Sequence, residues 1–191
     1  LIFFFLLGAH LPVITGDYLK QDDWNATFWN HNIISSHPAF YNALYELFRP
    51  ISALLFLTSD FICYEVENAK FVRLFNIFLL SVGAFITYIW VAMLSIKSKL
   101  LALVFSVTVF CLPTYQLLSS TAVYNHMIIA LICGQLSMLF FYKSLHNQNS
   151  IIKKYIIYSG ILFLAGILNY PPATMYFFVF LFIYFLFNIN N

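Results

Sequence analysis

Residues 155–187 read YIIYSGILFLAGILNYPPATMYFFVFLFIYFLF and contain no charged side chain. As one helix rising about 1.5 Å per residue, this run would be about 50 Å long, well beyond the bilayer core of about 30 Å. The tetrapeptide Asn169-Tyr170-Pro171-Pro172 interrupts the run, because proline lacks an amide donor and disfavours helix in the residue before it. The run therefore predicts two membrane spans that meet near Tyr170.

The composition of the whole chain excludes a water-soluble domain. Hydrophobic residues make up 62% of the chain and charged residues 8%, so too little polar surface remains to cover a folded domain in water. We predict an all-α fold, a polytopic transmembrane helical bundle of about six spans, in a single membrane domain over residues 1–191. The expected spans cover residues 1–14, 74–94, 100–118 and 127–142 and the two parts of 155–187. Because the chain starts at Leu1 and stops at the end of a span, we expect an N-terminal fragment; a cleaved signal peptide is the alternative for the first segment.

The charged residues predict the topology. All seven carboxylates lie between Asp17 and Glu67, within a loop that we place at residues 15–70, before the further spans of 71–191. If Ile51–Tyr64 does not cross the membrane, the later lysines fall on the side of the N-terminus, which the positive-inside rule makes cytoplasmic. These lysines are Lys97, Lys99, Lys143, Lys153 and Lys154. If that segment does cross, they lie outside. We prefer the first topology, with residues 15–70 external.

The external loop contains the candidate chemistry. Ser36 and Pro38 predict the start of an amphipathic helix suited to the membrane interface. Asp22 and Asp23 precede Trp24, an aromatic residue that favours the headgroup level, so a carboxylate pair is expected near the lipid surface. A carboxylate there could accept a proton from a hydroxyl, while a cation stabilises a phosphate leaving group. The candidate cations are Lys20, Arg49, Lys70 and Arg73. The alternative is an ordinary helix cap in a solvated loop.

Together these features resemble a known family. A first span, then Asp22-Asp23, an interfacial helix running into Arg49-Pro50-Ile51, and Tyr170-Pro171-Pro172 at an external turn are similar to the C-type (GT-C) membrane glycosyltransferases. The likeness is greatest to the serotype-converting O-antigen glucosyltransferase family. It implies transfer of a hexose, typically glucose, from a polyprenyl phosphate to a cell-surface glycan such as O-antigen, at the external face of the cytoplasmic (inner) membrane. It also implies Asp22 as the catalytic aspartate, Asp23 as the second acid and Arg49 as a donor contact.

The predicted site follows from these assignments. Its catalytic residues are Asp22 and Asp23, its donor phosphate-binding residues are Arg49, Arg73 and Lys20, and its substrate groove contains Tyr170 and His126. No metal ligands are assigned, and a divalent cation is neither assigned nor excluded. The expected partners are a polyprenyl-phosphate-linked sugar, a glycan acceptor and the lipid bilayer. No basic tract suggests nucleic acid.

Other interpretations remain open. His10 and His126 lie near the external ends of spans, so both could approach a lipid phosphate. The alternative is that they are interfacial anchors or helix-packing donors. Asn76, Gln116 and Gln135 are expected to form interhelical hydrogen bonds, and we expect the glycines of the later spans, Gly134, Gly160 and Gly166, to permit close helix packing. For the chain as a whole, a transporter or lipid flippase with a broken helix and a non-catalytic membrane subunit are the alternatives to an enzyme.

Overall fold

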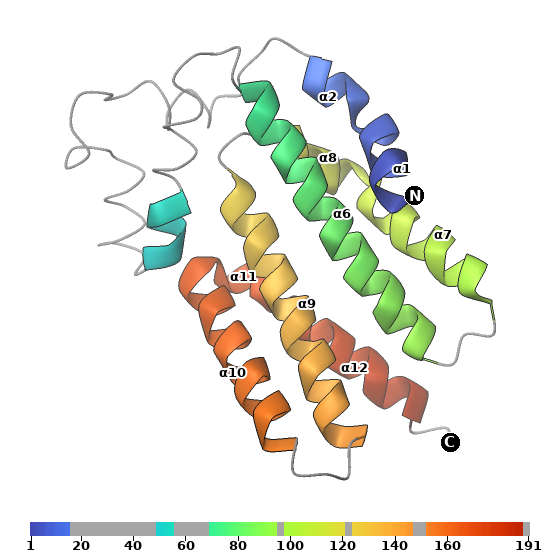
Figure 1. The fold of residues 1–191 in the computed structure, drawn as a ribbon, viewed down its shortest axis with the longest axis vertical. Helices are drawn as coiled ribbons and strands as arrows, with labels where there is room; N and C mark the ends of the chain where they lie inside the picture. The colour runs from blue at the N-terminus through green and yellow to red at the C-terminus, as the bar shows by residue number, and fades with distance from the viewer. Residues whose placement is uncertain (16–48, 56–68, 95–97, 121–123, 147–151, 189–191) are drawn as a thin grey trace.

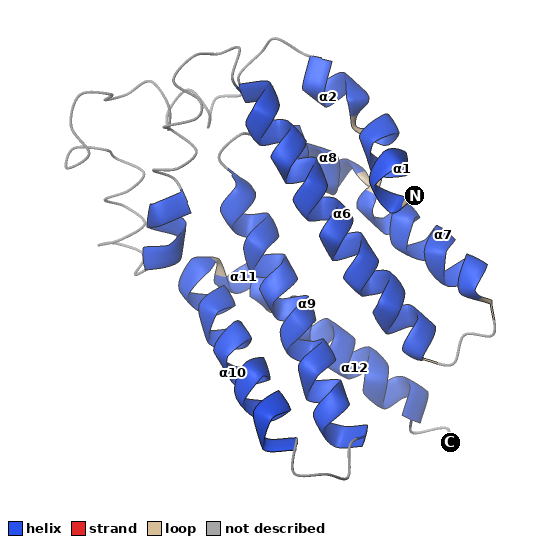
Figure 2. Ribbon diagram, in the orientation of Figure 1, coloured by secondary structure: helices blue, strands red, loops and turns tan. Residues whose placement is uncertain are grey.

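The described part of the molecule consists of helices joined by short turns. The computed structural model describes residues 1–15, 49–55, 69–94, 98–120, 124–146 and 152–188. Helices account for all the regular secondary structure in these ranges, and no strand occurs in them (Figure 2). The predicted all-α class is therefore confirmed. Asp22, Asp23, Lys20 and the predicted amphipathic helix after Ser36 lie outside the described residues.

The helices follow the expected apolar windows. In chain order they are α1 (Ile2–Ala9), α2 (Leu11–Thr15), a helical segment at residues 50–55, α6 (Ala69–Met93), α7 (Lys99–Phe110), α8 (Pro113–Ser120), α9 (Asn125–His146), α10 (Ile152–Asn169), α11 (Pro171–Thr174) and α12 (Tyr176–Asn188). Among the described residues, three helices are long and apolar enough to cross a bilayer: α6 over Lys70–Met93, α9 and α10. Lys99–Phe110 and Pro171–Leu186 are shorter apolar helices. The chain is thus a membrane protein with at least three candidate spans.

The long helices alternate in direction, as Figure 1 shows. α6 and α9 start at the same end of the bundle and finish at the opposite end, where α7 and α10 begin. Exposed lysines mark that second end, among them Lys99 at the start of α7, Lys143 near the end of α9 and Lys153 near the start of α10. This arrangement agrees with the predicted order of connections. Which end faces the cytoplasm stays a prediction.

Two predicted spans are divided in the structure. Residues 1–14 form α1 and α2, with His10 in the turn between them. We expected residues 100–118 to form a single crossing, but α7 ends at Phe110 and α8 begins at Pro113. Pro113 has no amide to continue the helical hydrogen bonds and disfavours helix at Leu112, so the chain turns there. The turn is held by the Leu112 amide, which donates to the Val109 carbonyl at 3.2 Å.

The core lies between α6 and α9. Over their most apolar windows, 56% of α6 and of α9 is buried, against 17% of α10, so α10 lies at the periphery. Gln135 and Asn76 form interhelical hydrogen bonds, as expected for these two residues. Gln135 Nε2 on α9 donates to Thr87 Oγ1 on α6 at 3.1 Å, and Asn76 Nδ2 on α6 donates to the Leu118 carbonyl on α8 at 3.4 Å.

Two glycines let α11 lie against α9 and α10. A Cβ atom on Gly134 would lie 2.6 Å from the Thr174 carbonyl oxygen, and one on Gly166 would lie 2.6 Å from Thr174 Oγ1. Both distances are too short for a real contact, so only glycine fits at either position. The expected role in close packing is confirmed for these two. It is wrong for Gly160, because a Cβ there would meet nothing within 4 Å.

Candidate functional site

Three predicted site residues from separate segments of the chain meet in the structure. Cζ of Arg49 lies 4.9 Å from the centroid of the Tyr170 ring, in a cation–π contact. The His126 ring meets the same tyrosine edge to face, with centroids 5.6 Å apart. Arg49 precedes the helical segment 50–55, His126 lies in the first turn of α9, and Tyr170 separates α10 from α11. We call Arg49, Tyr170 and His126 the cation–aromatic cluster.

Proline explains why two members of this cluster lie directly before the start of a helix. The Ala53 amide donates to the Arg49 carbonyl at 3.0 Å, so the helix begins at Pro50. Tyr170 has the same relation to Pro171, with an extended backbone (φ −147°, ψ 94°) before α11. Proline is favoured at the first position of a helix, and it holds the preceding residue out of helical geometry. Both side chains are therefore presented at the starts of helices.

Buried hydrogen bonds connect the elements that carry the cluster. Ser52 Oγ lies 2.9 Å from Asn169 Oδ1 and also makes a short contact with the Asn169 carbonyl oxygen. Asn169 Nδ2 donates to the His126 carbonyl at 2.8 Å. Ser52 and Asn169 are each 1% exposed. Sequence reasoning did not select either residue, although each lies within three positions of a cluster member.

Arg49 gives the cluster its positive charge. All seven carboxylates lie between Asp17 and Glu67, and none falls within the described residues. In that part of the chain, the guanidinium of Arg49 meets the face of an aromatic ring. The guanidinium is planar and carries its N–H donors along its edge, and this fork matches two phosphate oxygens. Arg49, partly buried against Tyr170, thus has the donor groups that binding of one phosphate requires.

The other predicted cation contacts occupy different places. Arg73 is 1% exposed, and its Nη1 donates to the Val13 carbonyl at 3.3 Å, which ties α6 to α2. Lys70 is exposed, with Nζ 5.5 Å from the Phe71 ring centroid. The contact described for Arg73 is therefore a helix-packing contact, and it does not join Arg73 to the cation–aromatic cluster. Lys20 lies outside the described residues.

His10 has a packing role. Its Nδ1 lies 2.7 Å from Ser119 Oγ, and its Nε2 lies 3.1 Å from the Phe110 carbonyl oxygen. Since a carbonyl only accepts, Nε2 carries the proton of that bond. His10 is fully buried, and it joins the turn between α1 and α2 to the ends of α7 and α8. The interpretation of His10 as a helix-packing donor is confirmed.

Metal coordination finds no support within the described ranges. There, no three His, Cys, Asp or Glu side chains are placed to share a metal ion.

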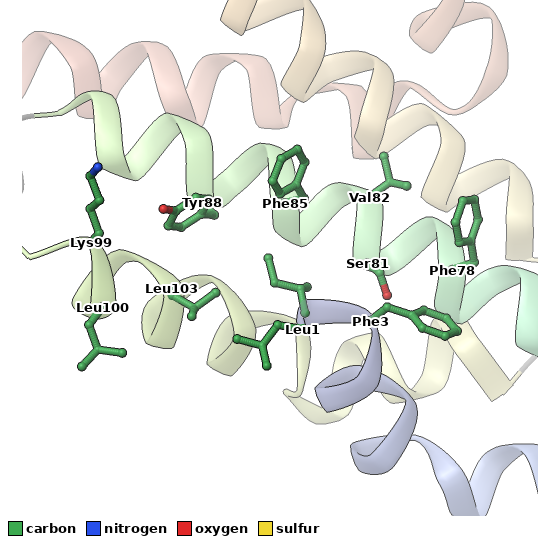
Figure 3. A pocket seen from close by; sticks show the side chains of 11 residues that line it. Leu1, Phe3, Phe78, Ser81, Val82, Phe85, Tyr88, Lys99, Leu100 and Leu103 are labelled. Carbon is green, nitrogen blue, oxygen red and sulfur yellow. The ribbon is translucent and has the colours of Figure 1, made fainter.

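A separate apolar groove lies between α1, α6 and α7. It has a volume of about 680 Å³, and its lining includes Phe78, Phe85 and Leu103 (Figure 3). Its polar groups are few: the Ser81 and Tyr88 hydroxyls and the Lys99 ammonium. Such a lining suits a hydrocarbon chain better than a sugar. It contains no residue of the predicted site, so the cation–aromatic cluster remains the better candidate for polar chemistry.

Comparison with known proteins returned no similarity on which an assignment could rest. No protein-family model, no curated protein and no solved structure matches the chain.

Proposed function

We propose that this chain belongs to a membrane glycosyltransferase that moves a hexose from a polyprenyl phosphate to a cell-surface glycan such as O-antigen. The proposal places the enzyme in the cytoplasmic membrane, with its site at the external face. The observation that supports it best is the meeting of Arg49, Tyr170 and His126, which come from three segments far apart in the sequence. Groups that act on one substrate must converge on it.

The proposed reaction is a substitution at the anomeric carbon. An acceptor hydroxyl attacks C1 of the hexose as the bond from C1 to the phosphate oxygen breaks. The proton of the hydroxyl passes to the carboxylate of Asp22, with Asp23 beside it in sequence. The bonding electrons leave with the lipid phosphate, which gains negative charge. No further reactant is needed.

In this proposal the cation–aromatic cluster stabilises the phosphate leaving group. Arg49 would hold two phosphate oxygens and stabilise the charge that develops on the leaving group. The Tyr170 ring would keep the guanidinium in one plane and so reduce its reorganisation during the reaction. His126 lies in the first turn of α9, where the partial positive charge of the helix start also favours an anion.

The test is sugar transfer in membranes that contain the protein, with polyprenyl-phosphate hexoses as donors. Asp22→Asn should abolish transfer, whereas the matched change Asp60→Asn, at another carboxylate of the same region, should leave it intact. Arg49→Gln should lower transfer at least about tenfold, the loss expected for one hydrogen bond to a charged group. Full transfer by Asp22→Asn at equal expression would refute the assignment of the base.

A transporter or lipid flippase is the second candidate, and a specific observation favours it. α10 ends at Asn169, and the short α11 and then α12 follow, so the helical run is discontinuous at polar residues. Transporters use such breaks to line binding sites. This candidate predicts movement of lipid-linked sugar across vesicles without transfer, and that movement should persist in Asp22→Asn. A non-catalytic subunit predicts neither activity.

A further inference from the structure

The cation–aromatic cluster is carried by three separate elements, and one buried amide contacts all three. Asn169 ends α10, directly before Tyr170. Through Nδ2 it donates to the carbonyl of His126 on α9, and through Oδ1 it meets the hydroxyl of Ser52 in the segment 50–55. The segment that follows Arg49 is thus hydrogen-bonded to the residue that precedes Tyr170.

The chemistry of asparagine suits this place. Its amide offers a donor and an acceptor at opposite corners, so one side chain can satisfy a carbonyl on one side and a hydroxyl on the other. Both Asn169 and Ser52 are 1% exposed, which removes water as a substitute partner. Loss of the Ser52 side chain would leave the buried Asn169 Oδ1 without the hydroxyl that donates to it, which is more costly than the loss of an exposed contact. Loss of the Asn169 side chain would remove the bond from Nδ2 to the His126 carbonyl.

The hydrogen bonds restrain the partners of the cation–π contact. Ser52 follows Arg49 by one turn of helix, and the Ala53 amide closes that turn on the Arg49 carbonyl. Tyr170 is the next residue after Asn169, and its amide donates to the Gly166 carbonyl at 2.8 Å. Arg49 and Tyr170 therefore have little freedom to separate while Ser52 and Asn169 remain bonded.

We propose that Ser52 and Asn169 are positioning residues, which hold the segment 50–55 against α9 and α10 and thereby keep the Arg49 guanidinium on the Tyr170 ring for an anionic ligand. The nature of the ligand rests on the proposed function. The positioning itself rests only on the buried hydrogen bonds.

The first arm of the test measures position without any ligand. Spin labels at Leu54→Cys and Ile157→Cys, both at exposed sites, report the distance between the segment 50–55 and α10 in a background without the native cysteines. Residue 157 lies twelve residues from Asn169, about 18 Å along the helix, so the label pair falls in the range of pulsed electron resonance. Variants are made at Ser52 and Asn169.

The matched control is Ser81→Ala. Ser81 is also buried, but its hydroxyl donates to the Ile77 carbonyl within its own helix at 2.8 Å. We expect the distance distribution to become about twofold broader in Ser52→Ala and in Asn169→Leu, as a local segment is released. The distribution should stay narrow in Ser81→Ala, and in Ser52→Thr, which keeps the hydroxyl. An unchanged distribution in folded Ser52→Ala would overturn the proposal; if Asn169→Leu does not fold, the comparison at Ser52 carries the test.

The second arm measures binding of farnesyl phosphate to the purified protein in detergent. Ser52→Ala should weaken binding about tenfold, as should Arg49→Gln, while Ser52→Thr should bind as the wild type does. The control for binding is Ser144→Ala, which should also bind as the wild type does, because the buried Ser144 hydroxyl donates to the Phe141 carbonyl within its own helix and does not line the apolar groove. If the distances change as expected but the wild type does not bind farnesyl phosphate, the positioning stands and the proposed phosphate site fails. If binding depends on Arg49 but neither distance nor binding responds to Ser52→Ala, the positioning fails and the phosphate site stands.

Discussion

The same substitution should have opposite effects at two glycines on neighbouring helices. At Gly134, a new Cβ would lie 2.6 Å from the carbonyl oxygen of Thr174 and 3.2 Å from its Cα. Because the obstacle is backbone, α11 as a whole must move. Overpacking of a core costs about 1–3 kcal/mol, and a backbone obstacle puts Gly134→Ala near the upper value. The gain in helix propensity is about 1 kcal/mol, so the net loss of stability is about 2 kcal/mol.

Gly160→Ala on α10 should behave differently. A Cβ there has no neighbour within 4 Å, so only the propensity term applies, and the variant should gain up to about 1 kcal/mol. The two variants should therefore differ by about 3 kcal/mol. Equilibrium unfolding in mixed micelles, followed by circular dichroism, measures both. Free energies of unfolding within about 0.5 kcal/mol of each other would refute the packing argument, since that is the usual scatter of neutral substitutions.

Thr174 provides a second check on the same packing. A Cβ on Gly166 would lie 2.6 Å from Thr174 Oγ1 and 2.7 Å from Cγ2, both of which Thr174→Ala removes. The double variant Gly166→Ala with Thr174→Ala should therefore be more stable, by about 1 kcal/mol or more in the free energy of unfolding, than the sum of the two single changes predicts. Gly134→Ala should show no such recovery, because its obstacle is the Thr174 backbone. Equal coupling at both glycines would contradict this difference.

Three further predictions concern single side chains. His10→Ala should destabilise the protein by about 2 kcal/mol in the same unfolding assay, because it leaves the buried Phe110 carbonyl without the imidazole that donates to it and removes the bond between His10 and Ser119. In a cysteine-free background, an impermeant maleimide should label Lys70→Cys from outside intact cells and Lys99→Cys only after permeabilisation; labelling of both from one side would contradict the alternating helices. Tyr170→Phe should retain most farnesyl phosphate binding, since the ring face remains, whereas Tyr170→Leu should weaken binding by about 0.5–2 kcal/mol. Equal Kd values for the two variants would show that the contact of Arg49 with the ring does not contribute to binding.

The helices were more predictable than the site. Proline and apolar length predicted the break at Tyr170 correctly, because both act through local backbone chemistry. The break at Pro113 has the same cause, but it was not predicted, because residues 100–118 form one uncharged window of the length of a single span. Of the predicted site, Arg49 and Tyr170 were selected from motifs and His126 from its place near the end of a span, and the three lie together. The role of Asn169 was not predicted, since an asparagine before Tyr-Pro is also an ordinary helix end.

The sequence by itself determined the all-helical membrane class and the order of the apolar segments, because hydropathy and proline act within one segment. Tertiary structure alone decided which faces of the helices meet. A helix that is apolar on nearly all sides carries no pattern to mark its inner face, so nothing in the residues of α10 shows that Gly166 is buried while Gly160 is open. The rotation of such a helix is set by contacts with other segments, here with Thr174 and Ser52. Those contacts also bring Arg49 to the ring of Tyr170.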